Sequence, residues 1–219
     1  MRFCAPLRGL LAVVFLGWAV AVPAQEPPAL QQLEAFSAGL ETLYARFDQQ
    51  VMSTDGTVRD TSSGEVWLAR PQRFRWAYGG DFPELVVADG KRIWIYDEAL
   101  EQVTVKDQSL EATDSPLALL TDPGQLERQF QVRDAGEAWG LLLLELRSMD
   151  AESEFERILL GLRNNQLELM VMEDAFGLRT ELRFRDIRRN VPLDDSLFSF
   201  EPPPGVDLIG DLPEGDRGP

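Results

Sequence analysis

Histidine is absent from the 219 residues of this chain, and its one cysteine, Cys4, lies in an N-terminal segment that we expect to be removed. Ser-His-Asp and Cys-His catalytic systems and nearly all zinc sites need one of these residues, so these sites are excluded. No glycine-rich loop has the spacing that binds phosphate. The acidic residues do not follow the calcium-loop pattern either. We therefore expect no catalytic residue, no metal and no cofactor.

Two carboxylates that act together as acid and base, as in glycosidases, stay open as an alternative. Acidic residues are numerous, with 37 on a chain of net charge −16. Nothing in the sequence marks any two of them as a desolvated pair with perturbed pKa values. Most are therefore interpreted as solubilising surface.

Basic residues are fewer than acidic residues in this chain, 21 against 37. Loss of Arg2 and Arg8 with the leader would leave 19 basic against 37 acidic residues, a net charge of −18. Such a surface is repelled by phosphate backbones and by anionic lipid headgroups. We expect neither nucleic-acid binding nor stable membrane insertion.

The N-terminal segment is typical of a secretory signal peptide. Its two arginines precede an apolar run, Leu10–Val22, that is too short to span a bilayer comfortably and ends near small residues suited to cleavage. An uncleaved anchor is the alternative. Cys4 precedes the apolar run, unlike the lipid-bearing cysteine of a bacterial lipoprotein. The mature chain would have no disulfide, so its core alone must stabilise it.

The predicted organisation is a signal peptide over residues 1–24 and one domain over residues 25–210. The segment after Asp207 is acidic and rich in proline and glycine, so we expect it to be mobile, with residues 211–219 forming a tail outside the domain.

Apolar residues at steps of three and four predict a helix over residues 27–50, which Pro27 and Pro28 would open. The stripe consists of Leu33, Phe36, Leu40, Leu43 and Phe47.

After Val51 the period changes to two, which is typical of strands. About ten strands indicate one large antiparallel sheet, curled or closed. Two short helices interrupt the strands, beginning at Ser115-Pro116 and Asp122-Pro123. The strands are predicted over Val58–Ala69, Phe74–Tyr78, Leu85–Ala88, Ile93–Tyr96, Val103–Val105, Leu141–Leu146, Phe155–Leu162, Leu167–Met172 and Leu178–Ile187.

Alternation assigns faces to two of these strands. Phe74, Trp76 and Tyr78 are predicted to point inward, with Arg73 and Arg75 toward water. In LRTELRFRD, the apolar face includes Leu182 and Phe184. The faces of Ile93 and Ile95 against Trp94 and Tyr96 stay unassigned because neither set is polar. An apolar concavity of this kind either is filled by the helix or stays partly open for an apolar ligand, and periodicity does not separate the two.

Six motifs in order resemble the outer-membrane lipoprotein carrier family, LolA, along nearly the whole mature chain. They are Phe47-x-Gln49, placed at the end of the predicted helix; Gly64-x-x-Trp67-Leu68-x-Arg70-Pro71-x-x-Phe74-x-Trp76; Ala88-Asp89-Gly90-x-x-x-Trp94-x-Tyr96-Asp97; Glu101-Gln102-Val103; Ser115-Pro116-x-x-Leu119-Leu120; and Phe198-x-Phe200-x-Pro202-Pro203-x-Gly205-Val206.

The resemblance implies a mainly β fold: an unclosed antiparallel β-barrel of about ten or eleven strands with a helical lid. It implies a monomeric periplasmic carrier that shields the acyl chains of lipoproteins. The partners implied are an inner-membrane lipoprotein-releasing ABC transporter and an outer-membrane receptor, LolB. That receptor is itself a lipoprotein, and this chain lacks a cysteine placed to carry lipid.

The resemblance also suggests roles for individual residues. Arg70 matches an arginine that bonds to the closed lid, so it is the predicted latch, with a planar fork of donors suited to helix carbonyls. The residues predicted to line the acyl-chain cavity are Leu68, Phe74, Trp76, Tyr78, Leu167, Leu169, Leu182 and Phe184. The predicted lid residues are Leu33, Phe36, Leu40, Leu43, Leu117 and Leu120.

Two other functions stay open. One is a periplasmic sensor or scaffold with the same half-barrel that binds misplaced lipoproteins and signals; such sensors usually carry a second domain, for which little chain follows Val206. The other is the carboxylate-based hydrolase.

Overall fold

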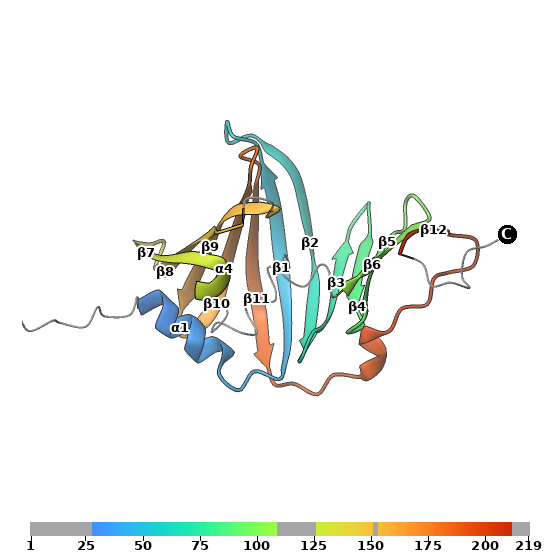
Figure 1. Cartoon of the computed structure of the whole chain (residues 1–219), viewed down its shortest axis with the longest axis horizontal. Helices are drawn as coiled ribbons and strands as arrows, with labels where there is room; N and C mark the ends of the chain where they lie inside the picture. Colours follow the sequence, from blue (N-terminus) through green and yellow to red (C-terminus); the bar gives the residue numbers. More distant parts are fainter. Residues whose placement is uncertain (1–27, 109–125, 151–152, 212–219) are drawn as a thin grey trace, which may run out of the picture.

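A single twelve-stranded sheet dominates the computed structural model, which describes residues 28–108, 126–150 and 153–211. The strands lie in the order β12-β6-β5-β4-β3-β2-β1-β11-β10-β9-β8-β7. All neighbours are antiparallel except β12 and β6, which are parallel. The strands at the two ends of this order, β12 and β7, do not pair with each other, so the sheet curves without closing (Figure 1). The predicted unclosed barrel is confirmed, with slightly more strands than expected.

The bounds of the elements follow the chain. The helices are α1 (Pro28–Ser37), α4 (Leu126–Gln129) and the 3₁₀ helix η2 (Asp195–Phe198). The strands are β1 (Thr42–Met52), β2 (Val58–Ala69), β3 (Arg73–Gly79), β4 (Glu84–Ala88), β5 (Arg92–Asp97), β6 (Gln102–Asp107), β7 (Phe130–Ala138), β8 (Leu141–Ser148), β9 (Phe155–Arg163), β10 (Gln166–Asp174), β11 (Arg179–Arg189) and β12 (Asp207–Gly210).

The nine predicted strands are confirmed, and three strands were missed: β1, β7 and β12. The prediction of one helix over residues 27–50 is wrong in its second half. Helix α1 ends at Ser37, Gly39 adopts a positive φ of 64°, and β1 begins at Thr42. A left-handed residue ends a helix at little cost when it is glycine. The motif Phe47-x-Gln49 therefore lies on a central strand.

One large apolar core lies on the inner face of the sheet. Its members come from α1, α4 and the inward positions of β1–β3 and β7–β11, and they include Leu33, Phe36, Phe47 and Leu160, all at most 1% exposed. Helix α1 covers β7–β10 at one end of the sheet (Figure 1). The amphipathic stripe predicted for the N-terminal half of this region is thus buried.

The C-terminal segment covers the outer face of β3–β6. Phe200 packs on Trp94 and Tyr96, with ring centroids 5.8 Å from each. Strand β12 then pairs with β6, so the expectation of a mobile segment after Asp207 is wrong for Asp207–Gly210. Trp94 and Tyr96 therefore face outward. The pairing of Ile95 with Val86, which contacts the inner core, puts Ile93 and Ile95 on the inner face.

Alternation predicted that Arg73 and Arg75 of β3 face water. In the structure both arginines contact the C-terminal segment. Arg73 forms an ion pair with Asp195 at 2.8 Å, and its guanidinium lies 5.0 Å from the ring centroid of Phe198. Arg75 donates from Nη1 to the carbonyl oxygen of Leu197, and burial lowers its pKa. The covering segment could not be foreseen from the alternation within β3 alone.

Candidate functional site

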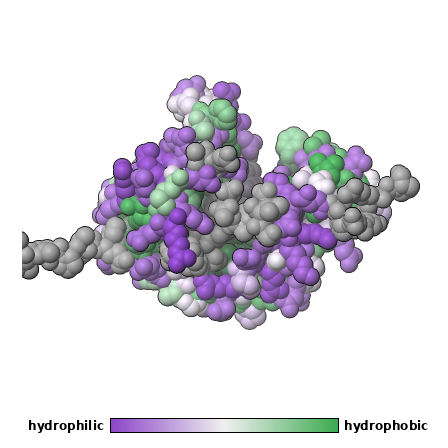
Figure 2. All heavy atoms as spheres, in the orientation of Figure 1, coloured by the Kyte–Doolittle hydropathy of each residue, from purple (hydrophilic) through white to green (hydrophobic). Residues whose placement is uncertain are grey.

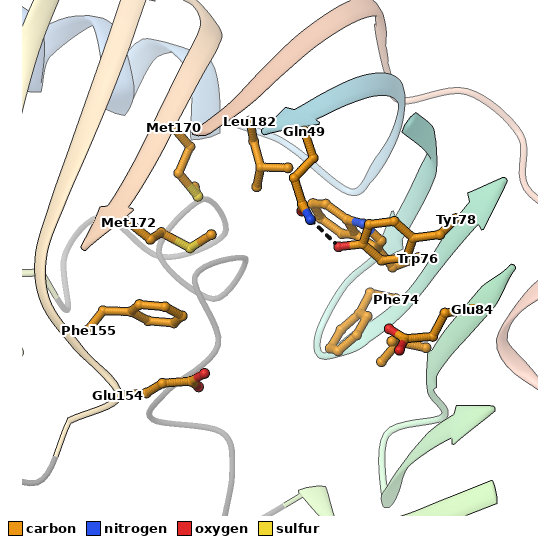
Figure 3. A pocket seen from close by; sticks show the side chains of 11 residues that line it. Gln49, Phe74, Trp76, Tyr78, Glu84, Glu154, Phe155, Met170, Met172 and Leu182 are labelled. Atoms are coloured by element: carbon orange, nitrogen blue, oxygen red, sulfur yellow. Dashed lines mark hydrogen bonds between the residues drawn. The ribbon is translucent and has the colours of Figure 1, made fainter. Parts of the chain in front are cut away.

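A pocket of about 340 Å³ opens on the inner face of the sheet (Figure 3). Its walls come from β1, β3, β4, β9, β10 and β11, which the curvature brings together. In Figure 3 the side chains of Gln49, Trp76 and Tyr78 lie on one side, opposite Phe155, Met170 and Met172. The full lining is Gln49, Phe74, Trp76, Tyr78, Glu84, Val86, Glu154, Phe155, Met170, Met172 and Leu182. A mostly apolar concavity with a few polar groups is the usual form of a site for an apolar ligand.

Four of the eight predicted cavity residues line this pocket: Phe74, Trp76, Tyr78 and Leu182. Three others, Leu68, Leu167 and Phe184, are buried in the inner core, with 2–9% of their surface exposed. The inner face therefore combines the two outcomes that the sequence left open. Part of it is a filled core, and part of it is a hollow.

Leu169 lies on the opposite face of the sheet, so its predicted place in the cavity is wrong. It packs there with Leu141, Leu143, Leu159 and Val171. The pairing register between β9 and β10 shifts between Leu167 and Leu169. A β-bulge of this kind inserts one residue and inverts the face of every residue beyond it. The same shift turns Met170 inward.

Sequence reasoning missed several lining residues. Met170 and Met172 lie on a strand whose two faces are both apolar. Alternation therefore did not show which of its residues point inward, and the bulge was not foreseen. Phe155 begins β9 and Val86 lies within β4; both strands were predicted, but the faces of these residues were not assigned. Gln49 was named within a motif, and its contact with the pocket depends on β1 being a strand.

Two polar side chains of the pocket are hydrogen-bonded to each other. The Tyr78 hydroxyl donates to Gln49 Oε1 at 3.1 Å. Burial, and to a lesser extent the charge of Glu84, raise the pKa of Tyr78 well above its ordinary value, so the phenol stays protonated and remains a donor. Burial and then the neighbouring charge of Asp97 raise the pKa of Glu84.

The predicted lid residues are dispersed. Leu33 and Phe36 lie on the buried face of α1, as expected for the underside of a cover. Leu40 lies in the connection after α1 and Leu43 on β1, so neither belongs to a helix, although both are buried in the inner core. Leu117 and Leu120 fall within residues 109–125, outside the described residues, together with both predicted short helices.

Arg70 lies between β2 and β3, partly buried, and precedes a cis peptide bond to Pro71. Its backbone N–H donates to the carbonyl oxygen of Glu41 at 2.9 Å. Among the described residues, its guanidinium makes no hydrogen bond or ion pair. The predicted latch contact therefore stays a prediction.

The surface outside the pocket is mixed in character. Figure 2 shows a largely hydrophilic face, with hydrophobic atoms at its upper projections and others scattered among the hydrophilic ones. Exposed apolar residues include Phe82 and Phe176, both in turns. Over residues 28–108, 126–150 and 153–211, no cluster of three or more acidic side chains is placed to hold a metal. None of the helices in these ranges is long and apolar enough to cross a membrane.

A curved, unclosed sheet whose inner face leaves a hollow of this lining defines a binding protein for an apolar ligand. The comparisons give the family. Residues 38–201 match the model of the outer membrane lipoprotein carrier protein LolA. The chain belongs to this family.

Two relatives illustrate the match. The outer-membrane lipoprotein carrier protein of Dechloromonas aromatica (strain RCB) is 40% identical over 183 residues, which is 84% of this chain and 88% of that protein. The protein of the same name from Chromobacterium violaceum is 38% identical over 204 residues, 93% of this chain and 98% of that protein. Among solved structures, an uncharacterized conserved protein from Thermus thermophilus covers 83% of this chain and 96% of its own, with a TM-score of 0.53 and 15% identity, and so shares the fold alone.

Proposed function

We propose that this protein is a periplasmic carrier that shields the acyl chains of lipoproteins while they cross the aqueous space between two membranes. The observation that carries the proposal is the pocket on the inner face of the sheet, in a chain whose family is that of the lipoprotein carriers. Its walls are built mainly from aromatic rings, methionines and aliphatic side chains, which suit a hydrocarbon tail.

The physics of the task fits a pocket of this kind. Each methylene group moved out of water contributes about 0.8 kcal/mol, so several acyl chains sum to tens of kcal/mol. Non-covalent binding of that strength would make release too slow for a carrier. A carrier should therefore shield only part of the lipid and take its cargo with external work.

The proposed partners follow from the family. An inner-membrane ABC transporter would load the carrier, and an outer-membrane receptor, LolB, would receive the lipoprotein. Residues 1–24 would act as a cleaved signal peptide that directs the chain to the periplasm, and the carrier would act as a monomer without catalysis. The strongly acidic composition supports a role away from anionic membrane surfaces.

The direct test is incubation of the purified mature protein with a purified triacylated lipoprotein, followed by gel filtration. We expect a soluble one-to-one complex. Phe74→Glu should reduce complex formation at least tenfold, because a charge in the apolar pocket is costly to desolvate. Phe82→Glu is the matched control, since Phe82 is 81% exposed in the turn before β4 and does not line the pocket. Failure of the wild-type protein to form a complex would contradict the proposal.

The lid and latch belong to the same proposal. Helix α1 with Leu33 and Phe36 would form part of the cover, and Arg70 would bond to the cover when it is closed. Arg70→Leu should leave the unfolding midpoint nearly unchanged but slow the delivery of lipoprotein to the receptor. Arg59→Leu, on an exposed stretch of β2, is the control. Delivery by Arg70→Leu at the wild-type rate would refute the latch.

A further inference from the structure

Trp76 carries a buried hydrogen-bond donor for which the described residues provide no partner. Its side chain lines the pocket and the residue is only 8% exposed, yet its Nε1 makes no hydrogen bond within the described part of the chain. Trp76 is near enough to the Tyr78 hydroxyl to lower the pKa of that group slightly, but no hydrogen bond of acceptable geometry joins them. Buried polar groups without partners are few in native proteins, and each calls for an explanation.

Trp94 shows what the same side chain does elsewhere in this sheet. It lies two strands away, on the outer face, and is 9% exposed. Its Nε1 donates to Asp89 Oδ2 at 3.0 Å. The two tryptophans are nearly equally buried, but only the outer one has an acceptor among the residues that the structure describes.

The chemistry of the pocket wall selects the kind of acceptor that is missing. An indole N–H is a donor only. Beside it, Gln49 accepts from the Tyr78 hydroxyl through Oε1, which leaves the two donors of its amide group for another partner. Figure 3 shows Gln49, Trp76 and Tyr78 together on one side of the pocket, facing the apolar side chains opposite. The groups on this wall that can still form hydrogen bonds to a ligand are therefore donors, and they need an acceptor.

The charge of the lining restricts the ligand further. Glu84 and Glu154 both line the pocket, and none of the described residues that line it is basic. A free fatty acid would bring a carboxylate close to these two acids, which repel it. The carbonyl oxygen of an acyl ester accepts hydrogen bonds and has no charge, so it satisfies the donors without that repulsion.

We propose that Trp76 Nε1, with the amide of Gln49 beside it, binds the ester carbonyl oxygen of an acyl chain held in the pocket. This inference rests on the proposed carrier function and adds a recognition element to it. Burial of hydrocarbon alone does not distinguish an ester from an ether. The hydrogen bond makes the pocket selective for acyl esters over ethers, and the charges of Glu84 and Glu154 disfavour free fatty acids.

The experiment compares dioctanoyl glycerol with its dioctyl ether analogue, both below their aggregation concentrations, as competitors of a fluorescent apolar dye bound to the mature protein. We expect the wild-type protein to prefer the ester by about three- to tenfold, which is the range that one neutral hydrogen bond provides. Trp76→Phe removes the donor and keeps an aromatic ring, so it should bind both lipids with nearly equal affinity. Trp94→Phe, which removes the partnered N–H on the outer face, should keep the preference.

The outcomes separate this inference from the function on which it rests. Equal affinity of the wild-type protein for the ester and the ether would overturn the inference and leave the carrier proposal intact, and so would a preference that survives in Trp76→Phe. Binding of neither lipid would overturn both. The wild-type comparison decides the matter by itself if Trp76→Phe fails to fold.

Discussion

The ring of Phe47 lies where a neighbouring strand position has no side chain. Phe47 on β1 lies opposite Gly64 on β2, and Gly64 lies opposite Tyr78 on β3. The ring centroid of Phe47 is 4.7 Å from that of Trp76 and 5.1 Å from that of Tyr78. Aromatic pairs at such distances add stability beyond the area they bury. Gly64 thus leaves room for the aromatic cluster that supports one wall of the pocket.

Gly64→Ala should destabilise the protein by about 3 kcal/mol, toward the upper end of what overpacking costs. A Cβ at this position would collide with the carbonyl oxygen of Ala77, and it would lie 2.8 Å from Cζ of Phe47. Urea unfolding followed by tryptophan fluorescence measures the change. Gly79→Ala is the control, because a Cβ there would meet only the Ser63 oxygen at 3.8 Å. A loss for Gly64→Ala no larger than the control's would show that the strands can move apart.

Ionisation of Glu84 lowers the stability of the folded protein, so this stability depends on pH. Its pKa in the folded protein is raised, first by burial and then by Asp97. The folded state therefore binds this proton more tightly than the unfolded state, and stability falls as the pH rises from the unfolded value near 4.5 through the raised folded value. Glu84→Gln should be more stable than the wild type at pH about 7, with the difference shrinking toward pH about 4.

Urea midpoints of the wild type and Glu84→Gln, taken across this pH range, check the prediction. Glu127→Gln, exposed on α4, is the control for loss of a negative charge. A stability difference that stays constant with pH would contradict the assignment of the cost to ionisation of Glu84.

Which residues face the pocket could be predicted where the strand is regular and not where it is irregular. The alternation of β3 placed Phe74, Trp76 and Tyr78 correctly. On β10 the bulge after Leu167 exchanges the two faces, so Leu169 points away and Met170 points in. Both faces of this strand are apolar, and its sequence therefore holds no mark of the bulge.

At the scale of elements, the boundary between α1 and β1 shows that the same apolar residues can fit the period of a helix and the period of a strand. Leu40, Leu43 and Phe47 continue the helical steps of three and four. Leu43 and Phe47 also fit a strand, because with Ala45 they alternate with more exposed residues and are all at most 4% exposed. Gly39 decides between the two by ending the helix. Strand β7 was missed for another reason: it forms one edge of the sheet, and most of its residues are exposed, so it has no regular apolar face.

The C-terminal segment packs on the outer face of β3–β6, and we expect this packing to stabilise the fold. Phe200→Ala should destabilise the protein by about 2 kcal/mol, less than the cost for a fully buried phenylalanine, because Phe200 is only partly buried. The ring lost is the one that packs on Trp94 and Tyr96. Glu201→Ala, at the exposed next position, should cost little. Thermal unfolding measures both, and equal midpoints for the two variants would mean that the segment only lies over the sheet without stabilising it.

At the scale of the whole molecule, charge is unbalanced: 37 acidic residues face 21 basic ones. Two effects of salt oppose each other. Screening weakens ion pairs such as that between Arg185 and Asp48, at 2.8 Å, but such pairs are exposed and contribute little each. Screening also weakens the mutual repulsion of the excess acids, which acts across the compact state as a whole. We expect the second effect to dominate.

Raising sodium chloride from about 0.01 M to about 0.1 M shortens the screening length from about 30 Å to about 10 Å. The thermal unfolding midpoint of the mature protein should therefore rise over this range, as measured by calorimetry. Potassium chloride at the same ionic strength should give the same rise, since screening does not depend on the identity of a monovalent ion. A fall in the midpoint would mean that the surface ion pairs outweigh the repulsion. The surface ion pairs would then stabilise the folded state by more than the excess acidic charge destabilises it.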